Sequence, residues 1–167
     1  MGISDLAHRK TAVFSPDRTY RYVLVRAWAE PDNFCMFIGL NPSTATETED
    51  DPTVRRCIAF AHRWGFGGMY MTNIFSIRAT DPKVMLAHES PVGPENDQYL
   101  VETALISQRV VACWGAHGRH RGRGAEVAEL MRRHRLYHLG LTKQGHPKHP
   151  LYLANATEPQ LWVRSVT

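Results

Sequence analysis

The sequence has little cysteine and no long apolar run, and both absences limit what the protein can be. Its three cysteines, Cys35, Cys57 and Cys113, lie far apart with no Cys-x-x-Cys spacing, which argues against a disulfide framework or a cysteine-rich metal site. We interpret them as buried thiols rather than metal ligands or nucleophiles, because two of them lie in apolar runs. No segment approaches the roughly 20 apolar residues of a membrane span, and residues 1–5 contain no apolar signal segment. We therefore expect no membrane partner and a cytoplasmic location.

Common cofactor and nucleophile motifs are also missing. The glycines of residues 115–124 fit neither the Gly-x-Gly-x-x-Gly pattern nor the P-loop pattern, and there is no Gly-x-Ser-x-Gly elbow. Two histidine pairs, His117 with His120 and His146 with His149, have the spacing of metal ligands on a helix. Both pairs lie in predicted loops, where that spacing does not bring the side chains together. We therefore predict no metal and no cofactor.

What is present is the composition of one globular domain. The 167 residues are 43% hydrophobic and 22% charged, and this length favours a single domain over residues 1–167. Apolar runs alternate with amphipathic helical segments, one of which begins with Asp51 as a cap and Pro52 in its first turn. The predicted fold class is α/β, a three-layer α/β/α sandwich with a central, mostly parallel four-stranded sheet plus an N-terminal β-hairpin. The expected hairpin arms are 9–14 and 20–29, the strands 34–40, 69–77, 109–114 and 136–141, and the helices 51–64, 94–106, 125–133 and 158–163.

Polar or aromatic residues follow each of the four predicted strands. The first strand runs into Gly39-Leu40-Asn41-Pro42, the second contains Asn73 near its end, the third ends at Trp114, and a His-Pro loop with His149 follows the fourth. Open α/β sheets bind ligands beyond the carboxyl ends of their strands. We therefore expect Asn41, Asn73, Trp114 and His149 to surround one crevice.

Charge is distributed unevenly along the chain. The net charge is +4, but residues 116–149 alone carry a net +6 before histidines are counted. Such a segment attracts phosphate groups, although an arginine-rich, solvated helix face is the alternative interpretation. The acidic residues 47–51 would repel a DNA backbone unless they point elsewhere or take part in chemistry.

The order of these motifs resembles the uracil-DNA glycosylase superfamily. The resemblance covers residues 34–153 and is carried by Gly39-Leu40-Asn41-Pro42, by the run ending in Thr72-Asn73-Ile74-Phe75, by Val110 to Gly115 and by the His-Pro loop. It is closest to the branches with a Gly-x-Asn-Pro first motif, such as the mismatch-specific enzymes. The whole chain also resembles a bacterial and phage family known only as a domain of unknown function.

The resemblance implies a role for individual residues. Asn41 would orient the water that attacks the sugar C1′, because an asparagine amide cannot act as a general base. Asn73 would hydrogen-bond the edge of a flipped base, for which an amide has both a donor and an acceptor. His149, or as second choice His146, would stabilise the departing base as an anion. Asn73 as a turn residue and His149 as a surface residue are the alternatives.

Further residues receive binding roles from the same resemblance. Gly39, Pro42 and Trp114 would line the base pocket together with Asn73, and Leu151 or Tyr152 would fill the gap left by the flipped nucleotide. The residues expected to contact DNA are Arg119, Arg121, Arg123, Lys148 and Leu151.

Three functions are consistent with these patterns. The first is a DNA glycosylase-like hydrolase that cleaves the N-glycosidic bond of a damaged or modified base, with nucleic acid as its partner. The second is a non-catalytic module that binds a base or nucleotide, and the third is an enzyme acting on free nucleotides or modified bases. Family members place an aromatic ring after the first motif, whereas residues 43–56 contain none, so uracil is not the expected substrate.

Overall fold

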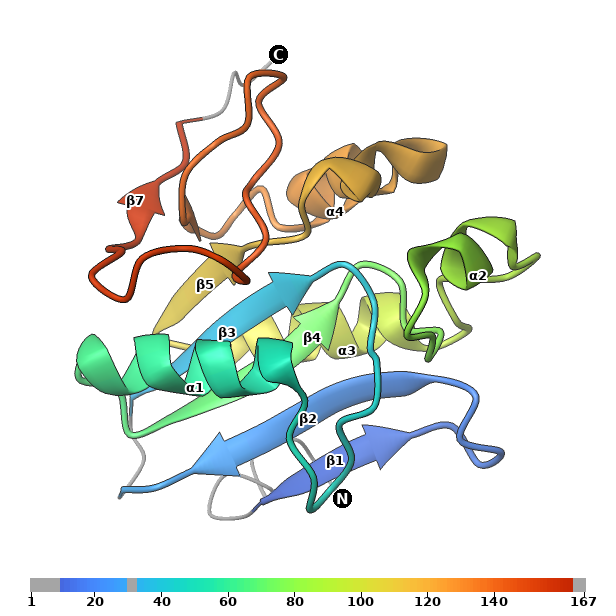
Figure 1. Ribbon diagram of the computed structural model, residues 1–167, viewed down its shortest axis with the longest axis horizontal. Helices are drawn as coiled ribbons and strands as arrows, with labels where there is room; N and C mark the ends of the chain where they lie inside the picture. Colours follow the sequence, from blue (N-terminus) through green and yellow to red (C-terminus); the bar gives the residue numbers. More distant parts are fainter. Residues whose placement is uncertain (1–9, 30–32, 164–167) are drawn as a thin grey trace.

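The computed structural model describes residues 10–29 and 33–163, and within them seven strands form one mixed sheet (Figure 1). The strand order is β1-β2-β4-β3-β5-β6-β7, and the pairings within β4-β3-β5-β6 are parallel. The predicted α/β class is confirmed. The predicted four-stranded parallel sheet is the centre of a larger sheet with three antiparallel strands at its edges. The strands are β1 (Thr11–Phe14), β2 (Arg21–Ala27), β3 (Phe34–Gly39), β4 (Gly68–Asn73), β5 (Arg109–Ala112), β6 (Leu136–His138) and β7 (Gln160–Leu161).

The two edges of the sheet differ from the prediction. The β1-β2 hairpin forms, but β2 also pairs with β4, with Leu24 opposite Met71, so the hairpin belongs to the main sheet. The first arm was predicted from residue 9, which lies outside the described residues. The helix predicted over 158–163 is wrong, because β7 pairs with β6 there.

Four α-helices and a 3₁₀ segment are present in the described residues: α1 (Pro52–Arg63), α2 (Pro82–Ala87), α3 (Asn96–Leu105), η2 (Ala116–Gly122) and α4 (Arg123–Leu130). The predicted start of α1 is confirmed, since the Asp51 carboxylate accepts a hydrogen bond from the Val54 N–H at 2.9 Å. The loop predicted over 115–124 is wrong in part, because it contains η2, and α2 lies in the segment 81–94, for which no element was predicted.

Helices cover both faces of the sheet, and Figure 1 shows α1 in front of the strands and α3 behind them. On the α1 face, Phe60 packs in a core that also contains all three cysteines. The prediction of buried thiols is confirmed, because each cysteine is free and buried. Burial raises the pKa of Cys35 and of Cys57 well above the ordinary thiol value.

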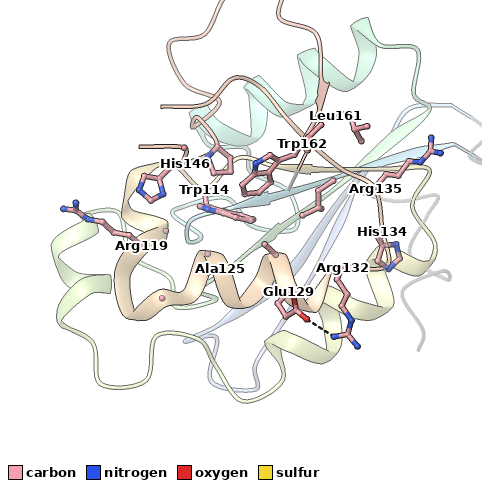
Figure 2. A pocket seen from close by; sticks show the side chains of 18 of the residues that line it. Trp114, Arg119, Ala125, Glu129, Arg132, His134, Arg135, His146, Leu161 and Trp162 are labelled. Atoms are coloured by element: carbon pink, nitrogen blue, oxygen red, sulfur yellow. Dashed lines mark hydrogen bonds and ion pairs between the residues drawn. The ribbon is translucent and has the colours of Figure 1, made fainter. Parts of the chain in front are cut away.

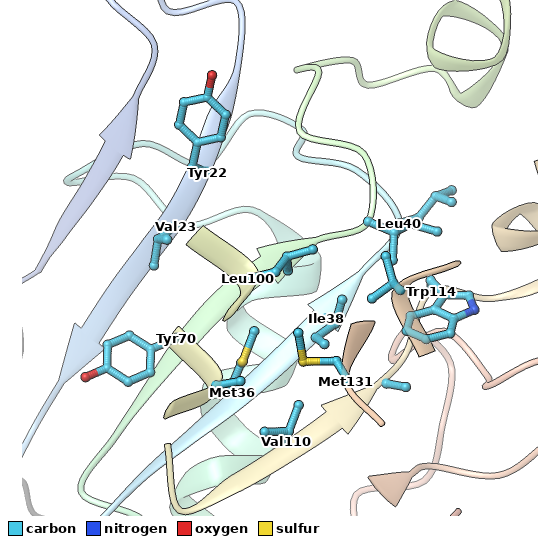
Figure 3. Close-up of a cluster of buried hydrophobic side chains, with 14 of the residues drawn as sticks. Tyr22, Val23, Met36, Ile38, Leu40, Tyr70, Leu100, Val110, Trp114 and Met131 are labelled. Carbon is cyan, nitrogen blue, oxygen red and sulfur yellow. The ribbon is translucent and has the colours of Figure 1, made fainter. Parts of the chain in front are cut away.

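The opposite face carries the second core (Figure 3), where Met36, Ile38 and Val110 of the strands meet Leu100 of α3 and Met131 beyond α4. All five side chains are buried. This packing fixes α3 and α4 against the parallel strands, so the carboxyl ends of those strands have rigid surroundings. None of the described helices is long and apolar enough to cross a membrane.

Candidate functional site

The carboxyl ends of the four parallel strands meet at one edge of the sheet, and backbone hydrogen bonds join the segments that follow them. Gly39 of β3 lies opposite Asn73 of β4 and accepts a hydrogen bond from the Ile74 N–H at 2.9 Å. The loop after β6 is joined to the end of β5, since the Gly115 N–H donates to the Pro147 carbonyl at 2.7 Å. The first and second motifs therefore adjoin, and so do the third motif and the His-Pro loop.

Asn41 fixes the turn after β3. Its half-buried side chain donates through Nδ2 to the carbonyls of Pro42 at 3.0 Å and Ala79 at 2.9 Å, with a longer contact to Ile77 at 3.4 Å. The amide nitrogen is thereby committed to the backbone, which leaves Oδ1 as the atom that can accept from a water or a ligand. A groove of about 350 Å³ next to this turn is lined by Ser43, Thr44, Arg78, Ala79 and Thr80.

Asn73 is buried beside Gly39, and the close approach requires a residue without a side chain. A Cβ at position 39 would lie 2.8 Å from the Asn73 Oδ1. Asn73 is 2% exposed, and the Nδ2 atom of its side chain has no hydrogen-bond partner. Its main-chain carbonyl accepts from the Asn96 Nδ2 at 2.8 Å, which fixes the end of β4. A buried amide donor without a partner is costly, and a ligand acceptor would remove that cost.

His149 lies half-buried in the loop after β6, and its surroundings favour the neutral ring. Burial lowers its pKa, and the nearby Asp51 carboxylate opposes that effect. The Nδ1 atom accepts a hydrogen bond from the Leu151 N–H at 3.3 Å. Because Nδ1 acts as the acceptor, the proton of the neutral ring lies on Nε2, which becomes a hydrogen-bond donor. The Asp51 carboxylate itself accepts from the backbone N–H groups of Ala45 and Val54.

A large cavity lies elsewhere, between α4 and the C-terminal segment (Figure 2). Its volume is about 1210 Å³, and of the predicted residues it is lined by Trp114, Arg119 and His146. Asn41, Asn73 and His149 do not line it. The expectation that one crevice collects all four strand-end residues is therefore not met, because Trp114 faces the α4 side. We call this cavity the α4 cavity, and we call the residues Asn41, Asn73 and His149 the strand-edge residues.

Trp114 forms the floor of the α4 cavity and explains the glycines that follow it. The indole is 2% exposed, and a Cβ at Gly118 would lie 2.1 Å from its Cδ1 atom, while one at Gly124 would lie 2.8 Å from its Nε1 atom. Figure 2 shows Trp162 next to it, with ring centroids 5.8 Å apart and planes at 59°. The glycine-rich segment therefore packs η2 and α4 over a tryptophan.

A comparison with protein families identifies the chain. Residues 21–151 match the family described as "Protein of unknown function (DUF1643)". The chain belongs to this family. Comparisons with curated proteins and with solved structures found no match. The strand-edge residues of this DUF1643 member all lie inside the matched range, whereas Trp162 lies outside it.

The cations predicted to contact DNA differ in accessibility within this DUF1643 member. Arg119 and Lys148 are exposed. Arg121 is also exposed but donates to the carbonyls of His88 at 2.9 Å and Glu89 at 3.1 Å. Arg123 is 2% exposed and forms ion pairs with Asp97 and Glu126, so it joins α3 to α4 rather than facing solvent.

The acidic segment that follows the Asn41 turn points toward the hairpin. Glu47 forms a 2.6 Å ion pair with Arg18, which lowers the Glu47 pKa to about 2. Asp50 forms a 2.8 Å ion pair with the buried Arg26. These carboxylates are therefore neutralised by the hairpin and do not add negative charge to the α4 cavity.

Some residues of the α4 cavity have no signal in the sequence. Trp162 reaches it from just after β7 and Arg135 from just before β6, and nothing local relates them to Trp114. The spacing of Gly118 and Gly124 after Trp114 was the available signal, since glycines pack closely on large rings. The described residues contain no cluster of three or more histidine, cysteine or acidic side chains able to hold a metal ion.

Proposed function

We propose that the protein is a glycosylase-like hydrolase that cleaves the N-glycosidic bond of a modified base in DNA. His149 carries the proposal, because its neutral ring has Nε2–H as a donor. Its loop is joined to the end of β5, which pairs with β3, and Asn41 follows β3. A departing base develops negative charge, and a fixed neutral donor stabilises that charge without first losing a proton.

The strand-edge residues divide the work of the reaction. The unpartnered Nδ2 of Asn73 would donate to a carbonyl oxygen or ring nitrogen on the base edge. Oδ1 of Asn41 would accept a hydrogen bond from the attacking water and orient it toward C1′. The water oxygen bonds to C1′ as the C1′–N bond breaks, the base takes the electron pair, and the water loses its proton to solvent. No side chain acts as the base, so the proposed reaction is slow.

DNA as the substrate is supported by the residues that follow His149. Tyr152 is fully exposed, and its φ of 69° is in the left-handed region that a bulky residue rarely occupies. Leu151 next to it is half-buried. An exposed ring beside the donor histidine suits insertion between stacked bases when a nucleotide is flipped.

The test is mass spectrometry of bases released from genomic and phage DNA, natural and hypermodified. We expect His149→Ala to reduce the rate of release by about 100- to 1000-fold, as for loss of one donor to a developing anion. His146→Ala tests the second-choice histidine, and the exposed His117→Ala is the control. Release that survives in His149→Ala at the wild-type rate contradicts the proposal.

A non-catalytic module that binds a base or nucleotide is the second candidate, and Asn41 favours it. The Asn41 amide is committed to the backbone, and the Asp51 carboxylate near His149 already accepts two backbone hydrogen bonds. Binding of DNA or nucleotides by the wild-type protein with no base released from any substrate would support this second function over the first.

A further inference from the structure

We infer that the α4 cavity binds a phosphorylated ligand with an aromatic ring, the chemistry shared by a free nucleotide and a nucleic-acid strand. The inference does not rest on the proposed reaction, since no strand-edge residue lines the cavity. The loop 146–149 separates the two places: His146 lines the cavity, and His149 lies beside Gly115 and is influenced by Asp51.

The charge of the lining attracts phosphate. Four arginines and one glutamate line the cavity, a net charge of +3 with the histidines neutral. Glu129 pairs with Arg132 at 3.1 Å. In the described part of the chain, Arg119, Arg133 and Arg135 are in no ion pair. Guanidinium groups of this kind bind phosphate oxygens through paired N–H donors.

The aromatic part of the ligand is recognised by Trp162. This half-buried ring packs against Trp114 with centroids 5.8 Å apart and meets His138 edge-on, with centroids 6.4 Å apart and planes at 89°. These ring contacts and the hydrogen bond from the main-chain N–H of Trp162 to the Leu136 carbonyl at 2.8 Å hold the residue in place. Because Trp162 also lines the cavity, it offers a preorganised surface for stacking, which tolerates any base.

The cavity has room for more than one nucleotide. Its volume of about 1210 Å³ exceeds the roughly 300–1,000 Å³ of typical small-ligand pockets. Figure 2 shows Arg119 on one side of the two indoles and Arg132 and Arg135 on the other. A stacked base between them can therefore extend phosphates in either direction, so a nucleotide and a strand both fit.

The experiment measures binding by calorimetry with three probes: thymidine monophosphate, a thymidine pentanucleotide and inorganic phosphate. We expect Trp162→Leu to weaken the binding of both nucleotide probes by about 5- to 150-fold, the effect of one lost stacking contact. The same variant should leave phosphate binding unchanged. Arg135→Gln should reduce the salt slope of pentanucleotide binding by about 0.7. The exposed Arg55→Gln, on α1 of the opposite face, is the matched control. Tighter binding of the pentanucleotide identifies a strand as the ligand, and equal binding identifies the free nucleotide.

Three results would overturn the inference. One is the absence of binding of either nucleotide probe to the wild type. Another is an equal reduction of the salt slope of pentanucleotide binding in Arg55→Gln and Arg135→Gln. The third is wild-type affinity in Trp162→Leu together with lost affinity in His149→Ala, which would place the nucleotide at the strand edge. Because this experiment measures binding, a negative result leaves the separate test of base release unaffected. The exposed Arg135 variant remains informative even if Trp162→Leu perturbs β7.

Discussion

Gly39→Ala tests whether the first motif needs a glycine in order to position Asn73. The added Cβ would lie 2.6 Å from the Met71 Cε and 2.8 Å from the Asn73 Oδ1. The flexible end of Met71 can move away from the new Cβ. The Asn73 amide is also too close, so it must move as well. Overpacking of this kind costs about 1–3 kcal/mol, or about 2–12 °C in Tm for a domain of this size. A displacement of the amide by about 1 Å should reduce base release by roughly 100-fold.

The matched control is Gly68→Ala at the start of β4, the strand whose other end is Asn73. There the added Cβ would lie 2.4 Å from the Phe34 ring, far from the strand-edge residues. Thermal unfolding should show similar losses of stability in the two variants, while base release should fall only in Gly39→Ala. Equal activity of the two variants would refute the reasoning, and so would a wild-type Tm for Gly39→Ala.

Two further predictions concern stability. Asn96→Ala should lower the free energy of unfolding by about 1–3 kcal/mol, because it removes the Asn96 Nδ2 donor from the buried Asn73 carbonyl. The Ile74 carbonyl also loses this donor but keeps the Arg123 Nε. Chemical unfolding that matches the wild type would contradict this prediction. Burial lowers the pKa of His138 and His149, so the unfolded chain binds more protons below about pH 6.5 and stability should fall as the pH drops through that value. Urea unfolding at pH 7.5 and 5 should show that His149→Gln loses less stability between the two pH values than the wild type does. An equal loss of stability in both proteins would be the contrary result.

Local signals in the sequence predicted the elements that neighbouring residues determine. Asp51 and Pro52 predicted α1 because a cap and a first-turn proline act within one turn of a helix. The apolar runs likewise predicted the four parallel strands, and with them the edge at which Gly39 and Asn73 adjoin. Asp81 with Pro82 carries the same signal for α2, but this helix is too short to show apolar periodicity.

Contacts between distant residues were not predictable from the sequence. Residues 158–163 have the composition of a short helix, yet the Trp162 N–H donates to the Leu136 carbonyl and β7 completes the sheet. The commitment of the Asn41 amide to Ala79 depends in the same way on a loop far along the chain. This contact changes the test of Asn41: Asn41→Asp would place a carboxylate oxygen against three carbonyls, so it alters the turn as well as the chemistry.

The hairpin shows why the strand edge and the α4 cavity differ in charge. Arg18 and Arg26 pair with Glu47 and Asp50, and the buried Arg21 donates to the Ala45 carbonyl at 3.0 Å. Three hairpin arginines are thus used to fix the acidic loop after the Asn41 turn, and they are withdrawn from solvent or neutralised.

Four exposed arginines, in contrast, line the α4 cavity, on the opposite face from α1. The family match begins at residue 21 and ends at 151, so it includes β2 and the strand-edge residues but not Trp162. A proposal about the strand edge therefore applies to the part of the chain that the family shares. Trp162 lies beyond the matched range, so the family match does not bear on stacking there.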